Sequence, residues 1–377
     1  MKKFDTISIL HVIFLSMTVI GLKNHVTIIP SLLKVAGRDG WASVILSTVA
    51  LFPWLFLLVY IHKKSKQEPV KDWLKRKIGK VGTSIVLYII AFYLIVLAAF
   101  TMRETLQWIT TTFLPKTPML IMLIIYTILC VLLVTSNLQT IAMINVMVLF
   151  GVVIFGFFVA FTNIQVKHPD LLRPFFEHGF SPVLKGMVYP ASGFIELVLF
   201  LFLQHQIKDK IRWYHFTIML LILMGLTLGP LVGAIIEFGP DEASKQTYPA
   251  YEEWGLISIG RFFEHLDFFS IYQWLTGAFI RVGVLLYVVV DIFNMNGKKK
   301  RIWLTLAPAF FFISLSLFLL SDTKFIEAKG SFLLPTTFFF FLILSLFLAS
   351  VAFISGRSSK KAKKINTQKV VKENDIG

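Results

Sequence analysis

The sequence predicts an all-α polytopic membrane protein, and three observations lead to this fold class. Hydrophobic residues make up 56% of the 377 residues and charged residues only 15%, whereas soluble domains contain about 25% charged residues. The apolar residues gather in runs close to the ~20 residues that a helix needs to cross a bilayer. These runs lack the alternation of apolar and polar residues that marks barrel strands, so helices remain as the spanning structure.

Ten apolar runs are long enough to be transmembrane helices. We place them at roughly residues 5–30, 41–62, 82–104, 118–136, 139–162, 184–204, 213–237, 266–292, 303–320 and 333–354. The connections between them are short, so the chain has no room for a large soluble domain.

The lysines and arginines predict which side of the membrane each loop faces. With the N-terminus in the cytoplasm, 24 of the 37 Lys and Arg residues fall in the inner segments and 8 in the outer loops. This asymmetry follows the positive-inside rule. It predicts that both termini are cytoplasmic, which in turn supports an even number of spans. We attribute the net charge of +16 to topology and contact with anionic membrane lipid, and expect no nucleic-acid partner.

No motif of a soluble enzyme is present. The chain has no Walker loop, no H-E-x-x-H, no G-x-S-x-G and only one cysteine, Cys130. We therefore expect no enzymatic activity, no catalytic residues, no cofactor and no metal site. The informative residues are polar side chains and helix breakers within the spans, because ionisable groups at membrane depth are costly and usually functional.

The first span carries a polar interruption near its middle or outer half. Gly21 precedes Lys23, Asn24 and His25, and Pro30 follows a few residues later. Such a run is easily tolerated where a helix unwinds beside a cavity, which makes these residues candidate ligand contacts. The alternative is a shorter span from which Lys23 extends to the outer surface.

The sixth span contains a second interruption. Pro190 and Gly193 weaken the helix, and Ser192 and Glu196 lie one turn apart on one face. We take Ser192, Gly193, Phe194 and Glu196 as candidate ligand-binding residues. Glu196 has three possible roles that the sequence does not separate: a proton site, a ligand contact or a structural hydrogen-bonding group.

The positions of the two interruptions predict the architecture. Broken helices at spans one and six of ten are typical of a leucine-transporter-like 5+5 inverted repeat, in which substrate binds between the breaks. We predict one transporter-like domain over residues 1–355, with repeats of about 5–162 and about 184–354. Residues 356–377 form a basic tail that we expect to be disordered and cytoplasmic.

Three further features are weaker. Tyr93 lies midway along the third span, which commonly lines the site in this architecture, although packing is the usual role of such a residue. Arg103 and Glu104 end the same span as either a gate pair or an interfacial ion pair. Glu264 and Asp267 lie near the outer mouth, where a solvated face explains them as well as an outer gate formed with Arg103.

The seventh span carries glycines four residues apart. Gly225, Gly229 and Gly233 share one helix face, with Pro230 among them. This spacing predicts a close-packing face with a kink, and we assign no ligand to it.

Taken together, these segments resemble one family. The chain is similar to the B subunits of endospore germinant receptors, the spore germination permeases of the amino acid–polyamine–organocation transporter superfamily. The resemblance covers essentially the whole chain and is strongest at Ile20-Gly21 to Pro30-Ser31, Ala36-Gly37-Arg38-Asp39-Gly40-Trp41, Gly193-Phe194-Ile195-Glu196 and Arg261-Phe262-Phe263-Glu264-His265-Leu266-Asp267.

The resemblance implies a function. It implies a ten-helix transporter-like fold in the spore inner membrane, a complex with an A and a C subunit, and recognition of a small nutrient such as an amino acid. One stretch departs from the family, in which a small, Gly-rich segment often follows the first glycine of span one. Here Leu22-Lys23-Asn24-His25 stands in its place. Three roles of Lys23 are then open. Its charge favours an anionic ligand group, or it stands in for a coupling cation, or the side chain points away from the site and does neither.

Two functions remain open from the sequence. The first is a sensor in which a nutrient bound between spans one and six biases a two-state equilibrium and triggers germination. The second is an active amino acid transporter of the same fold, coupled to protons through Glu196. A membrane enzyme or lipid carrier lacks any paired catalytic constellation.

Overall fold

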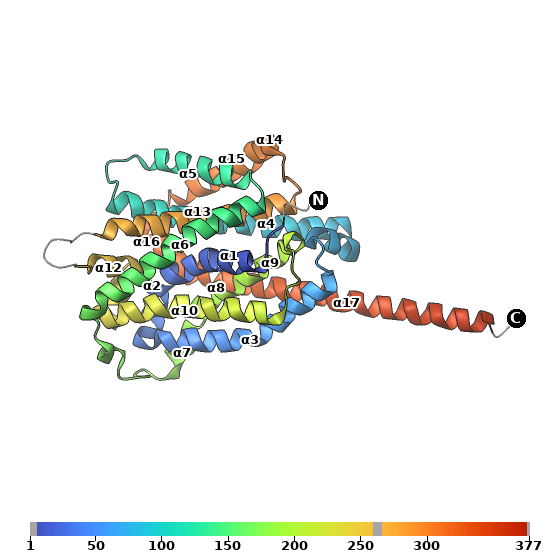
Figure 1. Ribbon diagram of the computed structural model, residues 1–377, viewed down its shortest axis with the longest axis horizontal. Coiled ribbons are helices and arrows are strands. Elements are labelled where there is room, and N and C mark those ends of the chain that lie inside the picture. The colour runs from blue at the N-terminus through green and yellow to red at the C-terminus, as the bar shows by residue number, and fades with distance from the viewer. Residues whose placement is uncertain (1–5, 259–265, 375–377) are drawn as a thin grey trace.

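The computed structural model describes residues 6–258 and 266–374, with side chains up to residue 354. These residues form a bundle of helices (Figure 1). Nine helical segments of the described chain are long and apolar enough to cross a membrane, and α5 is a tenth, shorter apolar helix. The predicted all-α polytopic membrane fold is confirmed.

The first part of the chain supplies five of the predicted spans. Its elements are α1 (Ile9–Leu22), the π-helical turn η1 (Lys23–Thr27), α2 (Ile29–Ala36), α3 (Gly40–Ser65), α4 (Val70–Thr112), α5 (Met119–Val134) and α6 (Leu138–Thr162). α4 is longer than its predicted span because a short surface helix precedes the spanning part. The two parts meet at a kink at Gly79, whose φ is 77°.

The second part supplies the other five spans and two short helices between them. Its elements are α7 (Phe180–Gly186), α8 (Val188–Phe194), the 3₁₀ turn η5 (Ile195–Val198), α9 (Leu199–Phe202), α10 (Trp213–Phe238), α11 (Pro240–Lys245), α12 (Pro249–Gly255), α13 (Phe269–Ile292), α14 (Lys299–Arg301), η8 (Ile302–Leu306), α15 (Ala307–Leu317), α16 (Asp322–Glu327), η9 (Ala328–Leu333) and α17 (Leu334–Asn374). The backbone of α17 is helical through most of the segment for which the sequence predicts disorder.

The predicted interruption of span one occurs as a change of helix type, whereas span six changes type just after its predicted interruption. Span one passes through the π turn at Lys23–Thr27, and span six tightens to a 3₁₀ turn at Ile195–Val198. The chain stays helical at both places and does not become extended. π turns inside helices are rare and are frequent at functional sites, and this one contains Lys23, Asn24 and His25. In span six only Glu196 falls in the 3₁₀ turn, whereas Pro190, Ser192 and Gly193 lie in the regular helix α8.

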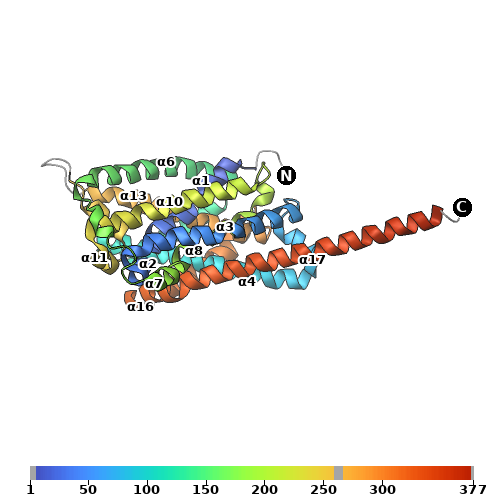
Figure 2. The ribbon, with the colours of Figure 1, turned by 90° about the horizontal axis from the view of Figure 1, so that it is seen from below.

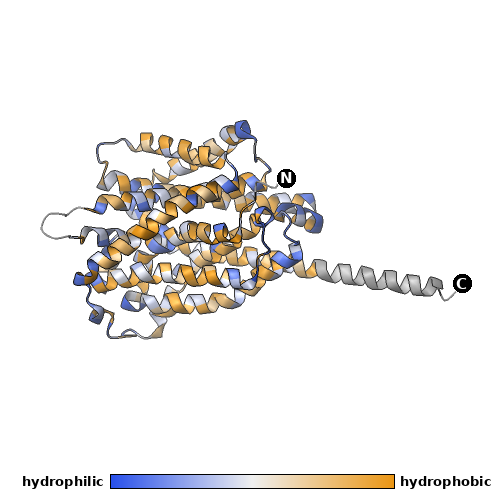
Figure 3. Ribbon diagram, viewed as in Figure 1, coloured by the Kyte–Doolittle hydropathy of each residue, from blue (hydrophilic) through white to orange (hydrophobic). Residues whose placement is uncertain are grey.

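The helices differ in how many of their residues are buried. α13 contains many buried residues, whereas α6 has few and lies along one side of the bundle (Figure 2). Figure 3 shows apolar residues along the lengths of the helices and hydrophilic residues gathered near their ends. This is the distribution expected for a bundle whose sides face lipid.

At one end of the bundle, segments that the sequence predicts to be cytoplasmic contact one another. Ile7 pairs with Ile207 through a backbone bridge, and Gln67 donates to the carbonyl of Ile207 at 2.6 Å. His62 and Gln204 are hydrogen-bonded at 2.7 Å nearby. The N-terminal segment and two of the predicted inner connections therefore lie at the same end, as the positive-inside assignment requires.

The glycine face of α10 differs from its prediction. A Cβ atom added at Gly225 or Gly229 would meet no atom within 4 Å, and only Gly233 of the three has a close neighbour, Glu253. The prediction of a close-packing face is therefore wrong for two of the three glycines, because these two border a cavity and not another helix.

The sidedness of the loops can be tested by cysteine labelling. Thr247 and Lys298 are exposed at the predicted outer and inner ends, and the native Cys130 is buried. A membrane-impermeant maleimide should label Thr247→Cys in intact cells, and Lys298→Cys only after permeabilisation. Labelling of Lys298→Cys in intact cells would reverse the predicted topology.

Candidate functional site

Spans one and six meet through Asn24 and Gly193. The Asn24 amide donates to the carbonyl of Pro190 at 3.3 Å and to the Thr227 hydroxyl at 3.2 Å, which joins η1 to α8 and α10. A Cβ atom at position 193 would lie only 1.7 Å from Asn24 Oδ1. The glycine is therefore required for the close approach of the two irregular turns.

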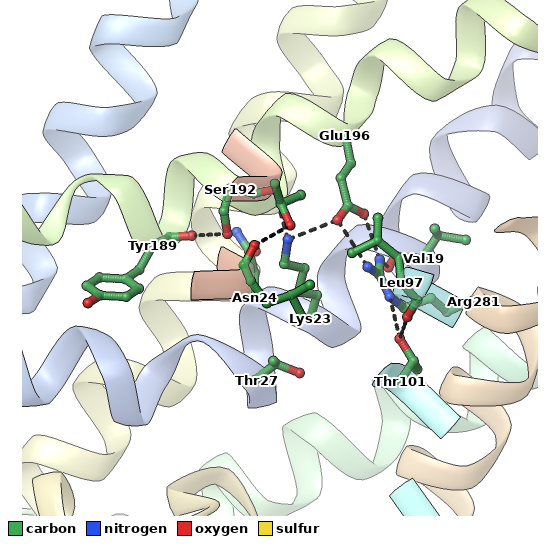
Figure 4. Close-up of polar contacts among 12 residues, drawn as sticks. Val19, Lys23, Asn24, Thr27, Leu97, Thr101, Tyr189, Ser192, Glu196 and Arg281 are labelled. Atoms are coloured by element: carbon green, nitrogen blue, oxygen red, sulfur yellow. Dashed lines mark hydrogen bonds and ion pairs between the residues drawn. The ribbon is translucent and has the colours of Figure 1, made fainter. Parts of the chain in front are cut away.

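A buried cluster of three charges lies beside this junction. Glu196 of η5 is completely buried, and Lys23 and Arg281 are 4% and 3% exposed. Lys23 Nζ lies 2.9 Å from Glu196 Oε1, and the Arg281 guanidinium contacts both carboxylate oxygens at 2.7 and 3.0 Å. Figure 4 shows the two cations approaching the carboxylate from different sides. We call these three residues the central ion cluster.

The central ion cluster connects four spans. The Lys23 ammonium also donates to the Ser192 carbonyl at 2.9 Å. Arg281 of α13 also donates to the Thr101 hydroxyl of α4 at 3.2 Å and to the carbonyl of Val19 in α1. A bidentate guanidinium–carboxylate pair fixes orientation as well as distance. Glu196 thus holds α1, α4, η5 and α13 in one arrangement.

The central ion cluster carries an excess positive charge. It contains two cations and one carboxylate, all inside a membrane-spanning bundle. Because the paired carboxylate cannot neutralise both cations, one positive charge is left without a full counterion. Unbalanced charge in a low-dielectric interior is costly and attracts an anion.

A second buried ion pair lies next to this cluster. Lys329 of η9 is 2% exposed and its ammonium lies 2.6 Å from Glu104 Oε1. Thr27 of η1 donates to the other oxygen of Glu104 at 2.8 Å. This pair joins α4 to η9 and to the π turn.

A small cavity separates the two groups of charges. Its volume is about 20 Å³, which is room for about one water molecule. Its polar lining consists of Lys23, Thr27, Thr101, Glu104, Arg281 and Lys329. This conformation therefore encloses a strongly charged space that is too small for an organic ligand.

The structure brings together five of the residues that the sequence selects. Lys23, Asn24, Ser192, Gly193 and Glu196 all take part in the junction or the central ion cluster. Ser192 contributes its carbonyl to Lys23, while its hydroxyl donates to the Tyr189 carbonyl at 2.7 Å.

Four other selected residues take no part in the central ion cluster. Phe194 is fully buried in the hydrophobic core. Gly21 and His25 line a different cavity, and the His25 ring contacts the carbonyl of Leu226 at 3.2 Å. The Tyr93 hydroxyl is hydrogen-bonded to Thr337 at 2.8 Å.

The predicted pairing at the outer end of α4 is wrong. Arg103 and Glu104 do not pair with each other, because neighbouring residues leave a helix in different directions. Arg103 pairs with Asp322 at 2.8 Å, and Glu104 pairs with Lys329. Of the other predicted outer-gate residues, Asp267 accepts a hydrogen bond from Tyr251 at 3.3 Å, and Glu264 lies outside the described residues.

Sequence reasoning missed several residues of the site. Arg281 is a charge inside span eight, and its position in an apolar run was a usable signal. Lys329 was counted with the outer loops, but η9 carries it into the protein. Thr27 and Thr101 gave no distinctive signal.

The fold and site define a polytopic helical membrane protein with an enclosed, charged centre between its irregular spans. Comparison with known proteins narrows this class. The family described as "Spore germination protein" matches residues 1–326, and the chain belongs to this family.

Three relatives align with this chain over most of its length. Spore germination protein XB of Bacillus anthracis is 38% identical over 335 residues, which are 89% of this chain and 94% of that protein. Spore germination protein A2 of Bacillus subtilis (strain 168) is 24% identical over 75% of this chain and 77% of its own. Spore germination protein KB of the same strain is 21% identical over 77% and 78%.

The unequal charges of the central ion cluster predict unequal effects on stability. Glu196→Gln leaves two buried cations without a counterion and should lower the free energy of unfolding by about 3–5 kcal/mol. Lys23→Met should cost less, because Arg281 remains paired with both carboxylate oxygens. Thermal unfolding of the purified variants measures both.

The double variant provides the control for this prediction. Adding Lys23→Met to Glu196→Gln removes one of the two uncompensated cations and should recover part of the lost stability. A Glu196→Gln protein as stable as the unmodified protein would contradict the central role of the carboxylate.

The contact at Gly193 predicts a steric effect. Gly193→Ala forces a methyl group into Asn24 and should destabilise the protein by about 1–3 kcal/mol, as overpacking usually does. Gly225→Ala is the matched control, because its methyl group meets open space. Unfolding temperatures of the two variants should differ clearly, and equal values would contradict the tight junction.

Proposed function

We propose that this chain is the nutrient-sensing subunit of a spore germination receptor. In this proposal a small molecule binds between η1 and η5 and triggers germination. Membership of the spore germination family supports the biological role. The observation that carries the proposed site is the excess positive charge of the central ion cluster, next to a small cavity bordered by η1, α4, α13 and η9.

The charges favour a ligand with an anionic group. Lys23 and Arg281 both line the small cavity, and they share the Glu196 carboxylate as ion-pair partner. A ligand carboxylate would supply the missing negative charge. Glu104 lines the same cavity and is held by Lys329 and Thr27. Its carboxylate would suit a ligand ammonium group, so an amino acid fits this pattern of charges.

Binding must change the conformation. Because the cavity has room for about one water molecule, a nutrient can enter only if the lining residues separate. The Glu104–Lys329 pair is the natural contact to break, since it lies between η9 and the π turn. A ligand that binds the wider form more tightly than the closed form shifts the equilibrium between them, which is what a sensor requires.

The rest of the receptor belongs to the same proposal. We expect A and C subunits to read out the conformational change, and we expect the protein to reside in the spore inner membrane with both termini in the cytoplasm. The exposed apolar sides of the bundle are compatible with such partners and with lipid.

The alternative function is proton-coupled transport of an amino acid. In that case Glu196 is the proton site. Both of its oxygens are held by Lys23 and Arg281, so a proton would have to displace a cation. This arrangement favours the sensor over the transporter.

The sensor proposal predicts a change in nutrient sensitivity. Lys23→Met removes the excess charge but leaves the Arg281–Glu196 pair intact. It should raise the nutrient concentration for half-maximal germination by about tenfold, as expected for the loss of about 1.4 kcal/mol of binding free energy. Germination of spores that carry the variant measures this shift.

The control is Lys34→Met, which changes an exposed lysine of α2 and should leave the response unchanged. Immunoblots of spore membranes must show equal protein levels. An unaltered response in Lys23→Met spores would refute the proposed site.

Counterflow in proteoliposomes separates the two functions. The sensor predicts no exchange of a labelled amino acid by folded protein, whereas the transporter predicts saturable exchange that Glu196→Gln abolishes. Saturable exchange by the unmodified protein would favour the transporter.

A further inference from the structure

A second cavity lies on the other side of α1. Its volume is about 490 Å³, far larger than the space at the central ion cluster. It lies among α1, α6, α10, α12 and α13. Its lining includes Met17 and Val26 of span one, Gly156 of α6, Gly225 and Gly229 of α10, and Glu253 of α12. From Met17 to Val26 the helix rises about 14 Å, so the cavity is elongated along the bundle.

The cavity opens on the lipid-facing side of α10. Ile218 and Leu221 are large exposed residues, and Gly225 and Gly229 continue the same helix face toward α12. A Cβ atom at either glycine would meet no atom within 4 Å. This face of α10 therefore carries large side chains at Ile218 and Leu221 but leaves open space at Gly225 and Gly229.

α6 forms the outer wall of this cavity. It lies along the side of the bundle beside α1 and α10 (Figure 2), and its Phe157 is 60% exposed. α6 and α10 are both candidate membrane spans. The opening between them is therefore at membrane depth, where the surrounding medium is the acyl chains of lipids.

One end of the cavity is polar. Glu253 is 9% exposed, lines the cavity, and its Oε1 atom has no hydrogen-bond partner in the described part of the chain. Burial, together with the nearby Glu237, raises the pKa of the Glu253 carboxyl well above its usual value. A protonated carboxyl can donate a hydrogen bond. Lys167, which is partly exposed and 3.6 Å from Glu237, also lines this end.

We propose that this cavity binds one membrane phospholipid. Its acyl chain lies between α6 and α10 over Gly225 and Gly229. Its glycerol ester accepts a hydrogen bond from Glu253, and its phosphate lies near Lys167. The apolar length, the opening at membrane depth and the single polar end together match this class of molecule, which has one apolar and one polar end.

The lipid would adjoin the central site. Leu22 and Trp274 line both cavities, and His25 of the π turn lines the larger one. An acyl chain in the larger cavity therefore contacts the helix that carries Lys23. Lipid occupancy and the conformation of the π turn are expected to depend on each other.

Photo-crosslinking tests the proposal. The full-length protein is reconstituted with a phosphatidylglycerol that carries a diazirine in its acyl chain, and the adducts are mapped by mass spectrometry. We expect adducts concentrated on α1, α6 and α10 around the cavity. Gly225→Leu combined with Gly229→Leu fills the cavity without steric clash at the Cβ atoms and should reduce these adducts about tenfold, corresponding to about 1.4 kcal/mol.

The matched control is Leu221→Phe, which adds bulk to the same exposed face outside the cavity and should leave the adducts unchanged. At the polar end, Glu253→Leu should reduce the adducts, whereas Glu253→Gln retains a hydrogen-bond donor and should preserve most of them. If the role of Glu253 were purely structural, Glu253→Leu and Glu253→Gln proteins with equal unfolding temperatures would give equal adduct yields.

Three results would overturn the proposal. The first is adducts spread evenly over all lipid-facing helices. The second is an unchanged pattern in the double glycine variant. The third is a non-lipid molecule that co-purifies in the cavity, detected by native mass spectrometry and lost in the double glycine variant.

Discussion

The structure depends on one buried carboxylate. Glu196 holds Lys23 and Arg281 inside the membrane-spanning bundle, and through them it connects η1, α4, η5 and α13. Without Glu196 both cations would lose their carboxylate partner, and an unpaired buried charge is strongly destabilising. The π turn, the 3₁₀ turn and the absence of a side chain at Gly193 all serve to bring these groups within hydrogen-bonding distance.

Other polar contacts hold the helices together at two further places in the bundle. On one side the Glu104–Lys329 pair covers the central ion cluster. At the opposite end, Gln204 is bonded to His62, and Gln206 donates to Asp291 at 2.7 Å, which joins the end of span six to α3 and α13. Ion pairs and hydrogen bonds of this kind have two discrete states, made or broken. In the sensor proposed above, the differential binding energy of a ligand would have to break such contacts.

The two cavities lie on different faces of α1 and its π turn, and their linings differ in polarity. On one face of α1 and its π turn the charged centre requires close pairing, and on the other face the large cavity is apolar along most of its length. Movement of the π turn would alter both. Under the two proposals above, nutrient and lipid would both act on this one segment of about one helical turn.

The sequence by itself determined the fold class, the approximate spans and the irregular turn of span one, because hydrophobic run length, charge asymmetry and polar interruptions are local properties. It misplaced the irregularity of span six, since Pro190 and Gly193 lie in a regular helix. It also marked Lys23 and Glu196, since a charge in an apolar run is conspicuous. Only the tertiary structure decided the partners. Arg281 and Glu196 are 85 residues apart, and Lys329 is buried although its sequence context indicated a loop. Helix rotation and packing select which charges meet and which glycines face open space, and neither can be read from local pattern.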